Sequence, residues 1–408
     1  MTPATATDPT DTATDPVAAA PPRFGVAGRT TAEHTALPSE ADQRWQFSNQ
    51  WEMLELADGS LFFDSVYADH RVISGPPRTL RRILLLIESE RPTLKEAAAR
   101  VVGAASPDVV DRVARLLAPL ARAGILVPLR DGERPAWADD ALVERFSTEL
   151  EWLGSLSTDA QGHWDYFGRL REAHVAVIGL GGAGSLLAQA LTAVGVGRLT
   201  LVDGDTVEPS NLVRQILYSP DQSGQGKADC LAEQLTRFSP YTSHRVLDQY
   251  VRDPQDVLRC IEGADFVAVC ADAPRFVLNR WIDEACKENR TPYLGAFAGS
   301  VGPMYRPGAT GCFGCLEHRL RAELGDRHDL LVDALAAKTS WRYPAFVSGP
   351  LTVAHLMTTE IVLHLTGAAP PSTAGGVVRF QHPHTVLEPF PGHPACDCAE
   401  GAHGPVAG

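Results

Sequence analysis

The amino-acid sequence predicts an α/β protein with a mostly parallel sheet covered by helices on both faces, preceded by a smaller α+β domain. Two observations carry this prediction. From residue 174 onward, short apolar runs alternate with amphipathic stretches of helical length, which is the pattern of repeated strand–helix–strand units. Before residue 132 the pattern differs, because a hairpin signal is followed by three amphipathic stretches.

Composition sets limits on the class of protein. The 408 residues leave room for two or three domains, and a formal net charge of −14 argues against a nucleic-acid partner, which needs a basic face. The first residues are acidic and lack an apolar core, so we expect no secretory signal and a cytoplasmic location. The uncharged stretch Val175–Gly197 approaches membrane-span length, but its closely spaced glycines indicate a strand, a turn and a helix, so we expect no membrane partner.

Four regions follow one another along the chain. Residues 1–40 are rich in Ala, Thr, Pro and Asp and predict a disordered tail. Residues 41–131 combine a hairpin at Asp58-Gly59 with three helices and a closing strand, which predicts a winged-helix-like domain. Residues 132–173 are interpreted as a linker with a helix, and residues 174–408 as the α/β domain.

The expected elements follow from periodicity and from start and stop signals. In the first domain we expect helices at 79–89, 93–102 and 108–124, where Thr93 and Ser106-Pro107 are starts and Gly124 is a stop, and then a strand at 125–129. In the second domain the strands and helices alternate. They are strands 174–180, 198–205, 264–272 and 291–299, helices 185–195, 226–240, 275–289 and 350–367, and two closing strands at 377–381 and 385–390.

A glycine-rich turn, GLGGAGS, lies between the first strand and the first helix of the second domain, and it contains Gly179, Gly181, Gly182 and Gly184. Glycines let the backbone approach a phosphate, and the following helix offers its free N–H groups. Asp203 ends the next strand, where a carboxylate accepts hydrogen bonds from a ribose. Up to this point an NAD-dependent dehydrogenase fits as well as an enzyme that consumes ATP.

The polar residues that follow do not suit NAD. They lie beyond strand carboxyl ends, where ligands bind in such sheets, and they are Asp205, Asn211, Arg214, Gln215, Lys227 and Asp272. Arginine and lysine at this edge stabilise charge on a transferred or leaving phosphate, and a carboxylate there holds Mg²⁺. Hydride transfer needs neither.

At these residues the sequence resembles the ubiquitin-activating-enzyme-like superfamily, which includes the ThiF and MoeB adenylyltransferases. The motifs are GxGGxGS, DxDxVxxSNLxRQ, GxxKA and CxD, and the resemblance covers residues 141–400. It implies a Rossmann-like fold, a homodimer, and attack of a carboxylate on the α-phosphorus of ATP·Mg²⁺. It also implies that Asp203 holds the ribose, that Asp272 coordinates Mg²⁺, and that the phosphate contacts come from Asn211, Arg214 and Lys227.

Eight cysteines in such a chain indicate reduced thiols or a metal site rather than disulfides. Four of them form two close pairs in turn-like sequence, as a tetrahedral Zn²⁺ site needs: Cys312, Cys315, Cys396 and Cys398. Because the second pair is C-x-C, His393 is the reserve ligand, and uncoordinated thiols are the alternative. The resembled family often carries such a structural zinc, and the remaining cysteines are interpreted as core residues.

The chain departs from the family pattern in two places. Residues 316–395 contain no cysteine, which argues against a thioester on the segment after the first zinc pair. The family also often supplies an arginine to the partner subunit's ATP from the helix before the first strand, where this chain has Thr148. Arg145, one turn earlier, is the candidate substitute.

The first domain resembles PqqD-like peptide-recognition domains in its hydrophobic pattern, and a packing or dimerisation domain is the alternative. Such domains bind the leader of a ribosomally made precursor peptide as an added strand. The combination predicts adenylation of a precursor-peptide carboxylate, as in peptide-modifying family members such as MccB and PaaA. Two alternatives stay open: a partner protein that delivers the precursor to a YcaO cyclodehydratase, and an activator of a sulfur-carrier protein.

Overall fold

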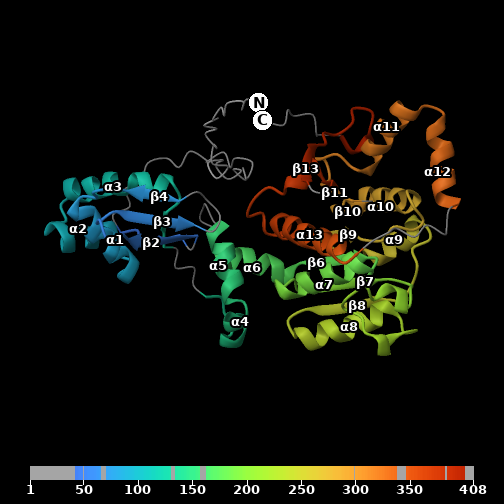
Figure 1. Cartoon of the computed structure of the whole chain (residues 1–408), viewed down its shortest axis with the longest axis horizontal. Coiled ribbons are helices and arrows are strands. Elements are labelled where there is room, and N and C mark those ends of the chain that lie inside the picture. Colours follow the sequence, from blue (N-terminus) through green and yellow to red (C-terminus); the bar gives the residue numbers. More distant parts are fainter. Residues whose placement is uncertain are drawn as a thin grey trace, which may run out of the picture. The chain divides into compact units, whose positions relative to one another are not determined.

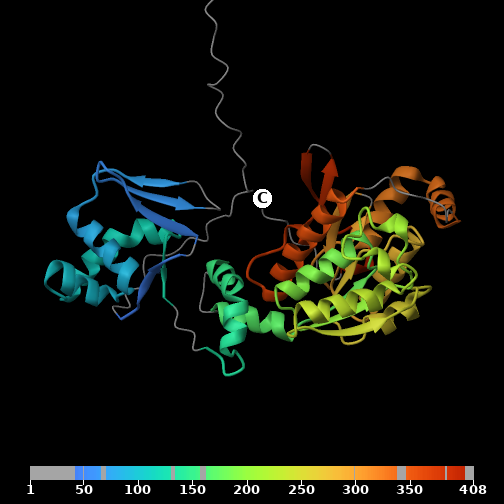
Figure 2. The same ribbon diagram turned by 60° about the horizontal axis from the view of Figure 1, so that its bottom comes forward.

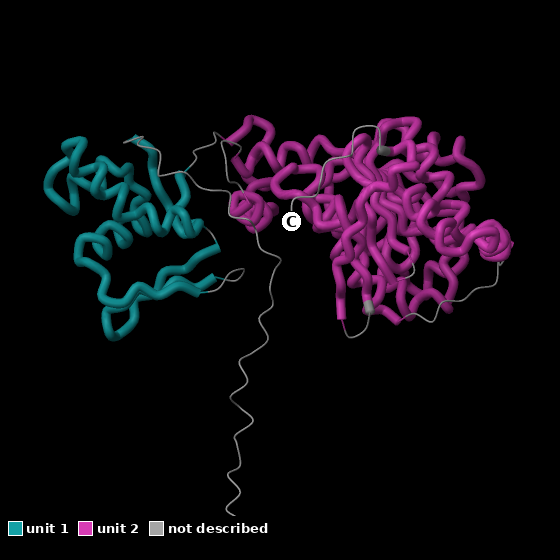
Figure 3. Tube along the Cα trace, turned by 90° about the horizontal axis from the view of Figure 1, so that it is seen from above, with its two compact units in different colours: residues 1–129 teal, residues 130–408 magenta. Residues whose placement is uncertain are grey.

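The computed structural model describes residues 42–48, 50–65, 70–129, 134–156, 162–297, 299–337, 346–381 and 384–399. The chain divides into two compact units, residues 1–129 and residues 130–408 (Figure 3). The tail predicted at residues 1–40 lies outside the described residues.

In the described residues of the first unit, two small sheets combine with three helices (Figure 2). Its elements are β1 (Trp45–Phe47), β2 (Trp51–Glu55), β3 (Leu61–Ser65), β4 (Arg71–Ile73), α1 (Arg78–Glu90), α2 (Leu94–Val102), α3 (Pro107–Arg122) and β5 (Leu126–Pro128). Strands β2, β3 and β4 form an antiparallel sheet, and β5 pairs with β1. This is the predicted hairpin, three helices and closing strand.

Local chemistry explains these boundaries. The hairpin turns at Gly59, which has a φ of +80°, and the Ser60 amide donates to Asp58 Oδ1 at 2.9 Å. Helix α2 begins with a capping box, in which the Thr93 hydroxyl accepts from the Glu96 amide and the Glu96 carboxylate accepts from the Thr93 amide. The apolar stripes of all three helices then meet over the buried face of β3.

The second unit is built on an eight-stranded sheet of order β13-β12-β11-β10-β9-β6-β7-β8 (Figure 1). Its strands are β6 (His174–Ile178), β7 (Arg198–Val202), β8 (Ser243–Leu247), β9 (Phe266–Val269), β10 (Tyr293–Phe297), β11 (Ser300–Tyr305), β12 (Gly376–Gln381) and β13 (His384–Pro389). Strands β10, β9, β6, β7 and β8 are parallel, and β11 to β13 extend the sheet antiparallel.

Helices cover both faces of this sheet, and successive residues of β6 point to opposite faces. Val175 and Val177 pack in a core formed mainly with α6 (His163–Glu172), α7 (Gly182–Ala193), α8 (Lys227–Phe238) and α13 (Ser348–Thr366). Ala176 and Ile178 pack in a second core with α9 (Pro254–Cys260), α10 (Val277–Glu288) and the start of α11 (Phe313–Leu324). Burial on both faces explains why β6 is apolar throughout.

The segment interpreted as a linker is more ordered than the sequence indicated. It forms α4 (Asp140–Arg145), α5 (Ser147–Leu156) and α6, and it belongs to the second unit. Leu142, Phe146 and Leu153 anchor it, because they are at most 4% exposed and lie in the same core as β6. The helix expected in this segment is present as α4 and α5, and only the interpretation of the segment as a linker is corrected.

The other elements of the described residues are α12 (Arg327–Ala337) and the 3₁₀ turns η1 (Pro209–Asn211), η2 (Pro220–Gln222), η3 (Ser372–Ala374) and η4 (Asp397–Ala399). The stretch Val175–Gly197 forms a strand, a turn and a helix, as predicted. Among the described residues, no helix has the length and apolar character that crossing a membrane requires.

Candidate functional site: a glycine turn and a four-cysteine cluster

The glycine turn joins the carboxyl end of β6 to the start of α7 and lies against the loop after β9. Gly179 has a φ of +89°, and a Cβ there would lie 2.4 Å from the Ala271 amide nitrogen. A Cβ on Gly184 would lie 1.8 Å from the carbonyl oxygen of Gly179. Only glycine fits these two positions. Helix α7 begins without a side-chain cap, which leaves its first N–H groups available to an anion.

Asp203, at the end of β7, holds this turn in shape. Its Oδ2 accepts a hydrogen bond from the Leu180 amide at 2.6 Å, and its Oδ1 accepts one from the Asp205 amide at 2.8 Å. Burial raises the pKa of the Asp203 carboxyl. The residue predicted to hold a ribose therefore also supports the backbone on which a phosphate would lie.

Lys227 and Asp205 form an ion pair beside the turn. The Lys227 side chain is 5% exposed, and its Nζ lies 2.9 Å from Asp205 Oδ2. The Tyr250 hydroxyl donates to Asp205 Oδ1 at 2.6 Å. Burial opposes ionisation of Asp205, but the hydrogen bonds from Tyr250 and Lys227 outweigh it and lower the pKa of this carboxyl. The ammonium of Lys227 is thus held at the carboxyl edge of the sheet.

The segment after β7 brings the predicted Asn211, Arg214 and Gln215 to the same edge. Asn211 is buried and its Oδ1 accepts from the Glu208 amide at 3.3 Å. The Arg214 backbone lies against the glycine turn, since a Cβ on Gly182 would lie 3.0 Å from the Arg214 carbonyl oxygen. The Arg214 guanidinium itself donates to the Ser210 carbonyl at 3.2 Å.

Asp272 lies beyond β9, in the loop that contacts the glycine turn. The amide of the preceding residue, Ala271, donates to the carbonyl of Ile178 at the end of β6, at 3.0 Å. The Asp272 side chain is exposed. An exposed carboxylate is the kind of ligand that Mg²⁺ takes in proteins.

The glycine turn, the residues after β7 and Asp272 lie where the strand order of the sheet reverses direction, which is its topological switch point. The chain runs from β6 outward through β7 and β8 and then returns to β9 on the other side of β6. In open α/β sheets, ligands bind outside the carboxyl ends of the strands at such a point. The turn after β6 and Asp272 after β9 flank this point, and the residues after β7 lie beside them.

Two observations test whether this edge fits a nucleotide. Gln215 is 4% exposed, and its Oε1 has no hydrogen-bond partner among the described residues. A Cβ on Gly181 would lie 3.5 Å from Gln215 Nε2, so this amide borders the glycine turn. A buried acceptor without a partner beside an uncapped helix start fits a site completed by a polar ligand.

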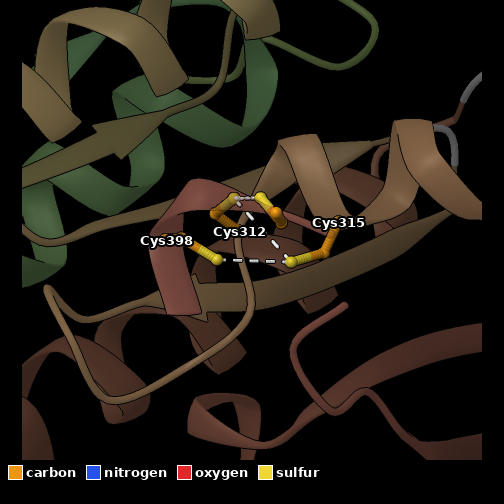
Figure 4. Close-up of side chains that lie close together, drawn as sticks. Cys312, Cys315 and Cys398 are labelled. Atoms are coloured by element: carbon orange, nitrogen blue, oxygen red, sulfur yellow. Dashed lines mark hydrogen bonds between the residues drawn. The ribbon is translucent and has the colours of Figure 1, made fainter. Parts of the chain in front are cut away.

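The four cysteines form a second site, and their sulfur atoms converge (Figure 4). The Sγ atoms lie 3.5 Å apart for Cys312–Cys396, 3.3 Å for Cys315–Cys398 and 4.0 Å for Cys312–Cys315, and all four are within 4.8 Å of one another. Ligand sulfurs at about 2.3 Å from a tetrahedral zinc are about 3.8 Å apart. The cluster therefore fits Zn²⁺, with every position filled by protein, as in structural sites.

His393, the reserve ligand, is not part of this cluster. Its backbone amide donates to Cys315 Sγ at 3.2 Å, while its ring stacks on His318 with centroids 4.8 Å apart. The imidazole thus faces a neighbouring ring, and the C-x-C pair completes the set of four thiols.

Arg145 contacts its own chain. Its Nη2 donates to the Phe238 carbonyl at the end of α8 at 3.0 Å, and its guanidinium carbon lies 5.1 Å from the centre of the Phe238 ring. Thr148, one turn later, is exposed. In this structure the Arg145 guanidinium contacts the C-terminal end of α8.

Sequence reasoning missed two groups that support these sites. At the nucleotide edge, the missed residues are Tyr250 and Tyr218. Tyr250 follows β8, a strand that was not predicted. The hydroxyl of the buried Tyr218 donates to the Leu180 carbonyl within the glycine turn at 2.7 Å. Near the cysteines, Asp283 and Lys287 appeared as ordinary charges of an amphipathic helix. A position just past a strand's carboxyl end was the signal that could have identified Tyr250.

Comparison with known proteins places these features in a family. Residues 161–399 match the model of the ThiF family. The ubiquitin-like modifier-activating enzyme 5 of Arabidopsis thaliana is 30% identical over 181 residues, which cover 39% of this chain and 41% of that protein. The adenylyltransferase and sulfurtransferase MOCS3 of Mus musculus is 36% identical over 154 residues, which cover 36% of this chain and 32% of that protein. The chain thus spans less than half the length of these relatives.

Solved structures agree with the fold. E. coli MccB with ATP superimposes with a TM-score of 0.68 at 18% identity, covering 87% of this chain and 99% of MccB. PaaA superimposes with a TM-score of 0.62 at 22% identity, covering 84% of this chain and 98% of PaaA. Because the family model spans more than half of the chain, this chain belongs to the ThiF family.

Proposed function

We propose that this chain is an ATP-dependent adenylyltransferase that activates a carboxylate on a ribosomally made precursor peptide. A carboxylate oxygen of the peptide attacks the α-phosphorus of ATP and forms the new P–O bond. The bond from the α-phosphorus to the bridging oxygen breaks, and pyrophosphate leaves. The peptide then carries an acyl adenylate, and a nucleophile displaces AMP.

The observation that carries the proposal is the meeting of the glycine turn, Lys227 and Asp272 at one edge of the sheet. The uncapped start of α7 suits the phosphates, and the Lys227 ammonium suits the negative charge that develops on the leaving pyrophosphate. The exposed Asp272 carboxylate would hold Mg²⁺, which neutralises phosphate charge when bound. A hydride-transferring site would need neither the buried lysine nor the carboxylate.

The first unit supports a peptide as the substrate. It contains the helices and strands expected of a peptide-recognition domain, and β2 and β4 form the two outer strands of its three-stranded sheet. An outer strand offers unpaired backbone groups to which an extended leader peptide can add as a further strand. Holding the leader raises the effective concentration of the attached carboxylate.

We also propose that the second unit acts as a homodimer. Val213 and Ile216, on either side of Arg214 and Gln215, are 68% and 50% exposed. Two large apolar side chains exposed next to the nucleotide edge fit a surface that a second copy covers. Sedimentation of the full chain tests this proposal, and a monomer at micromolar concentration would contradict it.

The second candidate is a delivery protein that binds the precursor and passes it to a separate YcaO-type enzyme. It is supported by Arg145 and Thr148, because the guanidinium is engaged with Phe238 and the threonine cannot replace a cation. The third candidate, activation of a sulfur carrier, is supported by the similarity to MOCS3.

Exchange of labelled pyrophosphate into ATP, measured with and without a precursor peptide, separates the first two candidates. Adenylation predicts exchange that depends on the peptide and is lost in Lys227→Ala. Tight peptide binding with no exchange would overturn the enzymatic proposal and favour delivery. Binding of the peptide by residues 40–135 alone tests the role of the first unit.

A further inference from the structure

Helix α10 and strand β10 bring polar side chains against the four-cysteine cluster. Asp283 and Lys287 are one turn apart on α10, and Tyr293 begins β10. Asp283 is 6% exposed and Tyr293 is 2% exposed. Buried polar groups of this kind persist when each has a partner, so their partners indicate what they do.

Asp283 and Tyr293 hold the backbone between the first two cysteines. The Phe313 amide donates to the Tyr293 hydroxyl at 2.8 Å, and the Gly314 amide donates to Asp283 Oδ2 at 3.2 Å. The Tyr293 hydroxyl in turn donates to Asp283 Oδ1 at 2.7 Å. Both amides inside the C-x-x-C turn are therefore fixed by one connected pair of side chains.

Lys287 joins this turn to the second cysteine pair, which comes more than 100 residues later in the chain. Its Nζ lies 2.8 Å from Asp283 Oδ2, 2.8 Å from Asp397 Oδ1 and 3.9 Å from Cys396 Sγ. An ammonium group has three donors, and these three contacts match that number. Asp397 is the middle residue of the C-x-C pair, so Lys287 contacts the tail at two adjacent residues.

The charges explain why a cation belongs there. Four thiolates around one divalent ion leave two negative charges in excess, and Asp283 and Asp397 add two more nearby. In the part of the chain that the structure describes, the Lys287 ammonium makes a direct contact with a cluster sulfur. Its side chain is 19% exposed, so solvent screens this interaction only in part.

We propose that Lys287 is the positioning residue of the metal centre. It fastens the Cys396–Cys398 segment to the Asp283-supported Cys312–Cys315 turn and offsets part of the negative charge of the zinc thiolates. Removing it lowers the affinity for Zn²⁺ and speeds zinc release by about 10- to 100-fold, the usual cost of losing a group that supports metal ligands. This role is independent of the reaction at the nucleotide edge.

The test is transfer of zinc from the zinc-loaded full chain to a chromogenic chelator, which gives both the release rate and the affinity. The variants are Lys287→Met, which keeps the apolar stem, and Lys287→Arg, which keeps the charge. Lys95→Met, the same change at an exposed residue of α2, is the matched control. Asp397→Asn weakens the contact between Lys287 and the tail, together with the 3.5 Å contact between Asp397 Oδ1 and Cys396 Sγ. The Asp397 side chain is 80% exposed, so this variant is expected to fold.

The proposal predicts at least tenfold faster release for Lys287→Met, a value within about threefold of wild type for Lys287→Arg, and no change for Lys95→Met. Wild-type release from a folded Lys287→Met would overturn it, and an equal loss in Lys287→Arg would overturn the charge argument. If Lys287→Met does not fold, Asp397→Asn decides the matter: faster release supports the proposal and unchanged release overturns it.

Discussion

Replacing Gly179 by alanine tests the glycine turn directly. At a φ of +89°, an L residue costs about 1–2 kcal/mol of strain. The new Cβ would also lie 2.4 Å from the Ala271 amide nitrogen and 2.6 Å from its Cα. Ordinary contacts are about 3.5 Å or longer, so the loop after β9 must move by about 1 Å. That movement separates the glycine turn from the loop that carries Asp272.

The matched control is Gly263→Ala, at the opposite edge of the same sheet. Gly263 has a φ of +69°, but its nearest neighbour for a new Cβ is His174 Nδ1 at 3.9 Å, an ordinary contact. Both variants therefore bear the backbone strain, and only Gly179→Ala bears the clash. Thermal unfolding measures how much the backbone strain lowers the stability of both variants. Titration calorimetry with ATP·Mg²⁺ measures the effect of each variant on nucleotide affinity.

We expect Gly263→Ala to bind ATP as the wild type does, and Gly179→Ala to bind it at least tenfold more weakly, which is about 1.4 kcal/mol. A displacement of about 1 Å in a positioning loop costs about 100-fold in rate, so turnover should fall further than affinity. Equal ATP affinity in the two folded variants would refute the assignment of this turn to the nucleotide.

Three further predictions concern Lys227, the zinc site and the half-buried Glu149. Lys227→Ala should lower the pyrophosphate-exchange rate by about 10²- to 10³-fold, because a preorganised charge at the leaving group is lost, while Lys95→Ala should leave exchange unchanged. Removing zinc with a chelator should free four thiols for titration and lower the unfolding temperature of the second unit; an unchanged melting curve would contradict a structural role. Burial raises the pKa of Glu149 from its ordinary value of 4.5 to about 7, so the folded state binds a proton on this carboxyl more tightly than the unfolded state does. The contribution of this proton to the free energy of unfolding is complete below about pH 4.5 and is lost as the pH rises through 7. Glu149→Gln should therefore raise the unfolding temperature at pH 8 more than at pH 5, and an equal shift at both would contradict this.

Several elements could be predicted from sequence because their signals are local. The capping residue Thr93, the Pro107 start of α3 and the turn at Gly59 lie where the sequence placed them. The glycine turn was also predictable, since an apolar strand buried on both faces leads directly into it. In each case a few consecutive residues are enough to determine where the helix, strand or turn begins or ends.

Other elements depend on tertiary contacts that the sequence does not reveal. Strand β8 has a largely polar pattern, SHRVL, because it lies at the edge of the sheet. Strand β11 contains Gly302 and Pro303, which normally argue against a strand, yet it is buried along its length between β10 and β12. Missing β8 also removed the reason to consider Tyr250, which follows it.

The supporting residues of the metal centre illustrate the same limit. The ligand cysteines were predictable from their spacing, but Lys287 resembles any charge on an amphipathic helix. Its partner Asp397 is 110 residues away, so only the fold brings the two together. The imidazole of His393 was a reasonable ligand by sequence, but stacking on His318 directs it elsewhere.

The central claim is that the edge formed by Gly179, Lys227 and Asp272 consumes ATP by transferring its adenylyl group to a carboxylate. The most direct measurement uses a precursor peptide whose carboxyl oxygens are labelled with ¹⁸O, followed by mass analysis of the released nucleotide. Attack of the carboxylate on the α-phosphorus, and later cleavage of the acyl bond, predicts AMP that carries one heavy oxygen. Unlabelled AMP, or ADP with phosphate as the products, would contradict the account.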